Sequence, residues 1–261
     1  MKRTDLFFEA AEINGSARSS DVHRNEMYGT EYIEVNVDKP SEGIAAGRYI
    51  TLFTEKGDVR ACLTELLGAF IPEGSVLVTG LGNENICSDS LGVKALRYIP
   101  ATAHLSVHRD FDDLGMRKVY VLEAGVTGKT GIESSGRIAC IAEYVEAEAV
   151  IAIDSLACAD ISRLCTTIQL TDTGISPGSG VGNDRRALNR STVGVPVIAI
   201  GVPTVIDLDS ITDSGSHNGL MVTPRNIDIL SAKLAETIGI SVSRALNPGL
   251  SEEELRSLIL L

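Results

Sequence analysis

The chain has 261 residues, of which 44% are hydrophobic and 22% are charged. This composition excludes a disordered chain, and the length allows one large domain with a substantial buried core. The chain contains 23 Lys and Arg and 35 Asp and Glu, which gives a net charge of −12. This negative charge repels the phosphate backbone of nucleic acids, so we expect no direct binding to nucleic acid.

Residues 1–47 are polar and irregular in pattern, and we interpret them as an N-terminal extension of a single domain that spans residues 1–261. Within this extension, residues 32–37 alternate between apolar and polar side chains, which predicts a half-exposed strand. A second strand is expected at residues 48–53. Leucine and phenylalanine then recur at helical spacing over residues 59–70, where a helix is predicted.

In the rest of the chain, short apolar runs alternate with segments of helical periodicity. The runs predict strands at residues 76–79, 118–122, 149–153, 167–170 and 195–202, and the periodic segments predict helices at residues 88–99 and 132–145. Thr130 and Glu133 form a capping-box sequence at the second of these helices, and Ser251 begins another before the last helix. A long helix is expected over residues 224–245 with Thr223 as its N-cap. The alternation predicts an α/β fold with a mostly parallel sheet and helices on both faces.

Two aspartates follow predicted strands of this sheet. The apolar run 150–153 is typical of a strand buried on both faces, and Asp154 ends it. The strand at residues 76–79 leads into a Gly80-Leu81-Gly82 turn, and Asp89 follows at the start of the next helix. Because sites in open α/β sheets lie beyond the carboxyl ends of the strands, we expect both side chains at one edge. Two carboxylates in a partly dry cleft can act as general base and general acid, which is sufficient for hydrolysis of a peptide bond without a covalent intermediate.

Each of these residues also has a structural interpretation. Asp89 fits a helix N-cap or a first-turn acid, and Asp154 fits a carboxylate held by loop amides. The glycine turn lacks the third glycine of a dinucleotide-binding fingerprint, since Asn85 occupies that position, and no cofactor is therefore expected.

Other motifs with catalytic residue types are interpreted as structural. Asp172 lies in an Asp-Thr-Gly sequence typical of β-barrel aspartic proteases, but alternating strands and helices contradict a barrel, so Asp172 is interpreted as a turn residue. The glycine-rich loop at residues 174–183 is a candidate anion-binding or substrate-binding loop. His104 and His108 lack the glutamate of a zinc-binding helix, and no metal site is expected.

Five scattered cysteines lack any Cys-x-x-Cys spacing and are interpreted as reduced, buried thiols of a cytoplasmic protein. No run of 18 apolar residues occurs in the chain, so we expect a protein without a membrane partner.

Short motifs occur in order along nearly the whole chain: RTDL at 3–6, GLGN at 80–83, TGIE at 130–133, AID at 152–154, TTIQ at 166–169, DTGI at 172–175, PGSGVGN at 177–183, GVPVIAIGVPTV at 194–205 and LMVTP at 220–224. Together they resemble the germination protease family of endospore-forming bacteria. The resemblance implies an atypical aspartic endopeptidase that initiates degradation of small acid-soluble spore proteins during spore germination. It also implies a phosphorylase/hydrolase-like fold similar to that of hydrogenase-maturation proteases, with Asp89 and Asp154 as the catalytic aspartates.

Members of this family are made as zymogens and assemble as homotetramers in the cytoplasm of the forespore and spore core. The family's processing site corresponds to the bond between Asp5 and Leu6, so residues 1–5 form a very short propeptide-like segment. An insertion that some members carry is missing between Asp207 and Leu220. The candidate substrate loop contains Gly178, Gly180, Gly182 and Asn183.

Two alternatives remain open beside this interpretation. One is a metal-guided maturation protease of the hydrogenase-maturation type, and the other is a non-catalytic α/β spore protein. Metal analysis separates the first from a metal-independent peptidase, and a cleavage assay separates the second.

Overall fold

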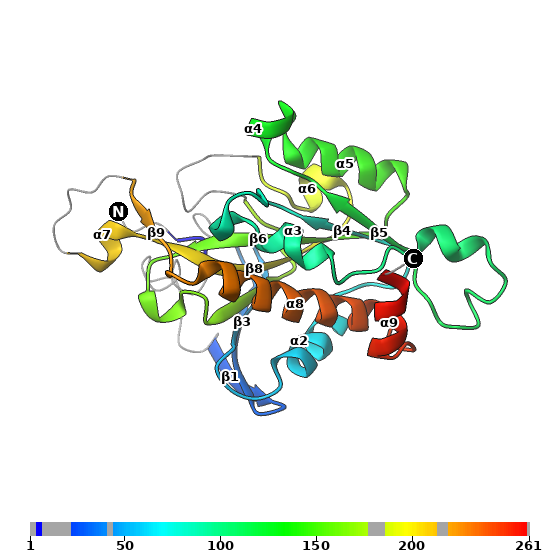
Figure 1. Cartoon of the computed structure of the whole chain (residues 1–261), viewed down its shortest axis with the longest axis horizontal. Coiled ribbons are helices and arrows are strands. Elements are labelled where there is room, and N and C mark those ends of the chain that lie inside the picture. Colours follow the sequence, from blue (N-terminus) through cyan, green and yellow to red (C-terminus); the bar gives the residue numbers. More distant parts are fainter. Residues whose placement is uncertain (1–3, 7–21, 41–43, 177–185, 213–218, 260–261) are drawn as a thin grey trace.

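The computed structural model describes residues 4–6, 22–40, 44–176, 186–212 and 219–259 of the chain. Its strands are β1 (Val22–Met27), β2 (Thr30–Val37), β3 (Gly47–Phe53), β4 (Val76–Gly80), β5 (Val119–Glu123), β6 (Ala149–Cys158), β7 (Thr167–Thr171), β8 (Val197–Asp207) and β9 (Met221–Val222). Its α-helices are α2 (Val59–Gly68), α3 (Leu91–Leu96), α4 (Thr127–Thr130), α5 (Ser134–Tyr144), α6 (Arg190–Val193), α7 (Leu208–Ile211), α8 (Ile227–Leu246) and α9 (Glu252–Ile259). Three 3₁₀ helices are η2 (Cys87–Asp89), η3 (Ala103–Val107) and η4 (Ile161–Arg163). Figure 1 shows the central sheet with helices on either side.

One sheet holds the nine strands of the described residues in the order β1-β2-β3-β7-β8-β6-β4-β5, with β9 paired to β8. Strands β5, β4, β6 and β8 run parallel, whereas β8, β7, β3, β2 and β1 pair antiparallel. The predicted α/β fold is confirmed, but the sheet is mixed and its parallel part is limited to one half. A tight turn at Tyr28-Gly29, with positive φ at both residues, reverses the chain between β1 and β2. The antiparallel pairs β3–β7 and β7–β8 instead join strands that lie far apart in the sequence.

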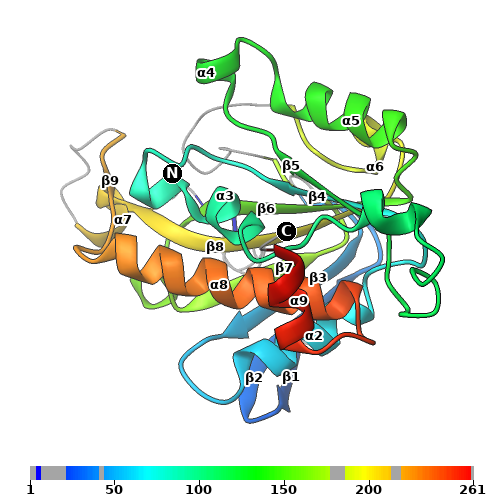
Figure 2. The same cartoon turned by 45° about the vertical axis from the view of Figure 1, so that its right-hand side comes forward.

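Strand β6 shows why helices cover both faces of the parallel half. Val150 and Ala152 pack in an apolar cluster with side chains of α5. Ile151 and Ile153 point the other way and pack in a larger cluster with α2, α3 and α8. Figure 2 shows α5 on one side of the sheet and α8 on the other. A strand buried on both faces needs successive apolar residues, which is the pattern that the sequence contains.

Helices α3 and α5 begin later than predicted. The segment 88–99 begins as the 3₁₀ helix η2, and α3 begins at Leu91. The capping box predicted at Thr130 and Glu133 does not form, because α5 begins at Ser134 with Glu133 as an N-cap that makes no side-chain cap bond. A glycine with a φ of 68° ends α4 between the two box residues, so they belong to different elements.

Of the two caps predicted for the C-terminal helices, the one at Thr223 is wrong and the one at Ser251 is confirmed. Helix α8 begins at Ile227, and Thr223 does not cap it, since the Thr223 hydroxyl donates to the carbonyl of Thr204 at 2.7 Å. The capping box at Ser251 is confirmed: its amide donates to the Glu254 carboxylate at 2.8 Å, and the Glu254 amide donates to its hydroxyl at 3.3 Å.

The cysteines are all free thiols, as predicted, but only three are buried. Cys62, Cys158 and Cys165 lie in the interior, whereas Cys87 and Cys140 are exposed. Burial raises the pKa of the Cys62 and Cys165 thiols to about 11, so these two stay protonated at neutral pH.

An ion pair between neighbouring strands gives a test of the antiparallel half of the sheet. The Arg48 side chain on β3 contacts the Glu34 carboxylate on β2 at 2.6 Å, and this hydrogen bond lowers the pKa of Glu34 below its ordinary value of 4.5. We expect Glu34→Gln to lower the free energy of unfolding at pH 7 by less than about 1 kcal/mol, because the pair is partly exposed. A carboxyl with a depressed folded pKa stabilises the protein above its unfolded pKa, and that stabilisation is lost as the pH falls through the folded pKa.

Urea unfolding at pH 7 and at pH 3 checks this expectation. The difference between wild type and Glu34→Gln should shrink at the lower pH, and Glu65→Gln, at an exposed position on α2, serves as the control. A difference that grows on acidification would contradict the assignment.

Candidate active site

The turn after β4 holds Asp89 in place. The amide of Leu81 still donates to the Ile153 carbonyl of β6 at 2.8 Å, and the chain then leaves the sheet through Gly82, which has a φ of 98°. A Cβ at Gly82 would overlap the carbonyl oxygen of Asp89, so only glycine fits here. The amide of Asn83 donates to the Asp89 carbonyl and to its carboxylate, both at 2.9 Å. The glycine turn therefore binds an acid of its own chain.

Two threonines join the same turn to β8 through hydrogen bonds. The buried Thr204 on β8 donates its hydroxyl to the Ser88 carbonyl at 2.6 Å, one residue before Asp89. The Thr223 hydroxyl in turn donates to the Thr204 carbonyl. These bonds tie η2 to β8, although the two lie far apart in the sequence.

Asp154 does not end its strand, contrary to the prediction. Strand β6 continues to Cys158 because its partner β8 also continues, and the two stay paired through a register shift after Leu156. Asp154 is only 4% exposed, and the amide of Ser155 donates to its carboxylate at 2.8 Å. Since β4 has already ended at Gly80, the final residues of β6 have a free edge on that side.

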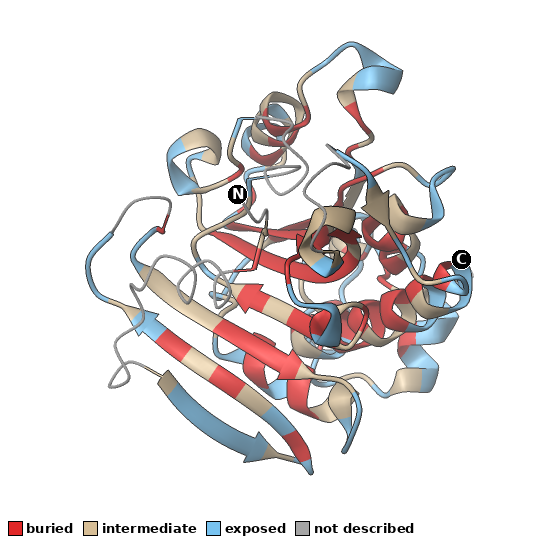
Figure 3. Cartoon of the chain, turned by 90° about the vertical axis from the view of Figure 1, so that its left-hand side faces the viewer, coloured by how far each residue is buried: buried red, intermediate tan, exposed pale blue. Residues whose placement is uncertain are grey.

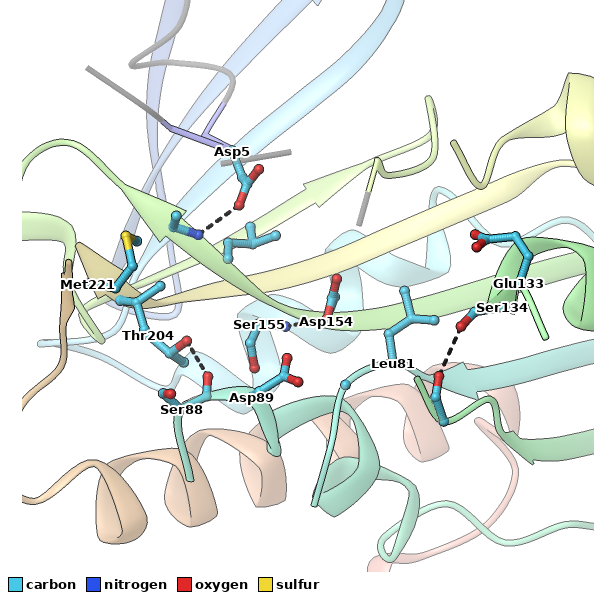
Figure 4. Close-up of a pocket in the computed structure, with 15 residues that line it drawn as sticks. Asp5, Leu81, Ser88, Asp89, Glu133, Ser134, Asp154, Ser155, Thr204 and Met221 are labelled. Carbon is cyan, nitrogen blue, oxygen red and sulfur yellow. Dashed lines mark hydrogen bonds between the residues drawn. The ribbon is translucent and has the colours of Figure 1, made fainter. Parts of the chain in front are cut away.

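The structure brings both predicted aspartates into one cleft of about 280 Å³. Asp89 enters it from η2 and Asp154 from β6, and Figure 4 shows the two side chains on either side of the β6 ribbon. The carboxylates of Asp5 and Glu133 line the same cleft. Sequence reasoning missed Glu133, which it assigned to a capping box, although the position of this acid after the parallel strand β5 was a signal for the same edge of the sheet.

Residues 4–6 lie against the free edge of β6. The amide of Asp5 donates to the Ala157 carbonyl at 2.9 Å, and the Ala157 amide donates to the Asp5 carboxylate at 2.8 Å. Leu6 is fully buried in a small apolar cluster with Leu156, Cys158 and Ile206. A second cavity, of about 330 Å³, lies against the same segment and is lined by Tyr49 and Gln169 among others. Asp5 thus lies between the two cavities and is bonded to the free edge of β6.

The remaining predicted residues lie elsewhere. Asp172 accepts the amide of Arg48 at 2.8 Å and does not line the cleft, which fits its interpretation as a turn residue. His104 belongs to η3, beside the amino end of β5, at the opposite edge of the sheet from the aspartates. The named members of the candidate substrate loop, Gly178, Gly180, Gly182 and Asn183, lie outside the described residues.

Two searches of the described segments were negative. They contain no group of three or more His, Cys, Asp or Glu side chains placed to hold a metal ion. None of their helices combines the length and the apolar content needed to cross a membrane.

Two carboxylates in one cleft, beside a peptide segment bonded to the free edge of a strand, are an arrangement suited to a peptidase, and comparison with known proteins gives that class. The profile of the germination protease family matches residues 57–217. The germination protease of Caldanaerobacter subterraneus subsp. tengcongensis is 33% identical, with 98% of each chain covered, and that of Clostridium tetani shows the same identity and coverage. The germination protease of Bacillus cereus is 38% identical over 80% of this chain and 64% of its own length. The chain belongs to the germination protease family and is a protease.

The relatives also show that this chain is a compact version of the family. Its alignment with the Caldanaerobacter protein extends over 318 positions, against 261 residues here, so that relative carries segments that this chain lacks.

The hydrogen bond from Thr204 to Ser88 holds the turn that carries Asp89, so its loss is expected to lower activity. We expect Thr204→Val to lower kcat for cleavage of a spore protein by about tenfold, because the Ser88 carbonyl loses its buried donor and the turn loosens by about 1 kcal/mol. Thr204→Ser keeps the hydroxyl and should retain near-normal kcat. Steady-state kinetics and thermal unfolding of both variants check the prediction, and equal kcat for Thr204→Val and wild type would refute it.

Proposed function

We propose that this chain is an endopeptidase that initiates the degradation of small acid-soluble spore proteins during spore germination, with Asp89 and Asp154 as its catalytic pair. One observation supports this most directly: both aspartates line a cleft at which the main-chain amide of Asp5 already binds the Ala157 carbonyl of β6. A peptidase has to hold its substrate extended beside the reacting groups, and a free strand edge can do so through main-chain hydrogen bonds.

In this mechanism one carboxylate is ionised and accepts a proton from water, whose oxygen attacks the carbonyl carbon of the substrate. The other carboxyl is protonated and gives its proton to the leaving nitrogen as the C–N bond breaks. The products are a carboxylic acid and an amine, and the two acids exchange protonation states in each turnover. The amides of Asn83 and Ser155 hold one oxygen of each carboxylate and so orient the pair.

The same site supports a zymogen. We propose that residues 1–5 are a short propeptide and that the bond between Asp5 and Leu6 is the processing site. In support, residues 4–6 occupy the free edge of β6 beside both aspartates, where a substrate strand would bind. Release of this segment would open the edge at Ala157 and join the spaces on its two sides.

Other parts of the proposal come from the family alone. They are a homotetrameric assembly, a fold similar to that of hydrogenase-maturation proteases, and location in the cytoplasm of the forespore and spore core. A metal-guided maturation protease remains the alternative, and metal analysis of the purified protein together with activity in a chelator distinguishes it.

The catalytic pair is tested by isosteric replacement. We expect Asp89→Asn and Asp154→Asn each to reduce kcat on a purified acid-soluble spore protein by about 10²–10⁴-fold, because an amide cannot carry a proton to or from the reaction. Asp172→Asn is the matched control, since it changes a carboxylate outside the cleft and should keep activity. Mass spectrometry of the products and circular dichroism of each variant are the measurements. Full activity in either cleft variant would exclude the pair.

Self-processing gives a separate test. Incubation of the wild-type protein at mildly acid pH should yield a new N-terminus at Leu6. The mechanism needs one protonated carboxyl in the pair, and a lower pH favours the protonated form. Asp154→Asn should remain uncut under the same conditions and become cut when wild-type protein is added. A timed N-terminal analysis follows the reaction, and processing of the variant by itself would count against the assignment.

A further inference from the structure

The hydroxyl of Ser155 is a buried polar group whose role the aspartate pair does not explain. Its Oγ is hidden from solvent and has no hydrogen-bond partner within the described part of the chain. Ser155 follows Asp154 on β6, and it lines the cleft together with both aspartates. A buried hydroxyl without a partner lowers the stability of the folded protein, so its presence at this position needs a reason.

The direction of the strand places Ser155 on the side of Asp89. Alternation along β6 puts Ser155 on the same face as Ile151 and Ile153, which pack with α3 and α8. Helix η2, which carries Asp89, contacts β6, β8 and α8 on this face. In Figure 4 the labelled side chains of Ser155 and Asp89 both lie below the β6 ribbon, and both line the cleft.

The surroundings of this hydroxyl favour a donor role. The ionisable groups that line the cleft are the carboxylates of Asp5, Asp89, Glu133 and Asp154. The Ser155 amide is already bonded to the Asp154 carboxylate, which leaves the hydroxyl as a neutral O–H at the same residue. Hydrolysis of a peptide bond builds negative charge on the carbonyl oxygen, which is stabilised by a donor and not by a further carboxylate.

We propose that Ser155 is a catalytic hydrogen-bond donor whose hydroxyl binds the carbonyl oxygen of the scissile peptide bond. The residue is partly exposed in the cleft wall, and rotation between staggered positions about Cα–Cβ turns the hydroxyl toward a bound peptide. The substrate supplies the partner that the hydroxyl lacks in the free protein. This inference rests on the proposed function, since it needs a peptide bond bound between Asp89 and Asp154.

The proposal predicts opposite effects on stability and activity. Ser155→Ala removes a hydroxyl that has no partner in the described part of the free protein, so the midpoint temperature of thermal unfolding should stay the same or rise. The same change removes a donor in the transition state, so kcat should fall by about 100-fold while KM changes little. A hydroxyl with only a structural role would lower both stability and activity.

Thr79 on β4 is the matched control. Its hydroxyl is also buried and without a partner in the described residues, but Thr79 does not line the cleft. Thr79→Val should therefore leave the thermal midpoint unchanged or raised, with wild-type kcat. Ser155→Thr keeps a hydroxyl on a β-branched residue that suits a strand, and it should recover most of the kcat lost in Ser155→Ala.

The experiment uses the self-processed protein, and the substrate is a purified acid-soluble spore protein. The kinetics of wild type, Ser155→Ala, Ser155→Thr and Thr79→Val are measured with their thermal unfolding. A low kcat with unreduced stability in Ser155→Ala alone supports the donor role. Wild-type kcat in Ser155→Ala, or a joint loss of kcat and stability, overturns it. Absence of cleavage by wild type, or full activity of Asp154→Asn, instead overturns the proposed function itself.

Discussion

The early end of β4 is the constraint on which the rest of the site depends. Strand β4 ends at Gly80, which pairs with Ile153 of β6, and the chain then turns away through Gly82. Strands β6 and β8 stay paired for several residues beyond that level. This difference in strand length makes a free edge on β6 and a cleft beside it. Asp154 lies where the edge begins, and the turn that leaves the sheet places Asp89 opposite. Figure 3 shows the buried residues of the inner strands and the exposed β1 at the far edge of the sheet.

Main-chain donors are the second shared feature of the site. The Asp89 carboxylate accepts from the Asn83 amide, the Asp154 carboxylate from the Ser155 amide, and the Asp5 carboxylate from the Ala157 amide. Each of these acids is thus oriented by backbone, which moves less than a long side chain. Such preorganisation matters in hydrolysis, because groups that are already in position need no reorganisation when charge develops. It also lets several carboxylates share one cleft in a chain with a net charge of −12.

Part of the N-terminal segment lies beside the two aspartates. Only Thr4, Asp5 and Leu6 of the first 21 residues are described. Asp5 lines the cleft, and all three residues line the second cavity. Asp5 bonds to Ala157 through its amide and its carboxylate, and Leu6 is buried among apolar side chains. In the proposed function a substrate strand would bind at the same edge, so this segment would have to leave before the substrate could take its place.

The sequence by itself determined the α/β class, because buried apolar runs and helical periodicity are local patterns. It also predicted that Asp89 and Asp154 lie at one edge of the sheet, because each follows such an apolar run, and both line the cleft. Local patterns could not reveal the mixed sheet, since strand direction depends on which distant strands pair. Nor could they reveal that β6 continues past Asp154, which follows from its pairing with β8. The contact between Asp5 and Ala157 joins residues 152 positions apart, and Glu133 enters the cleft only because β5 lies beside β4. Only the tertiary structure decided these features, because they depend on long-range packing and hydrogen bonding that no short segment encodes.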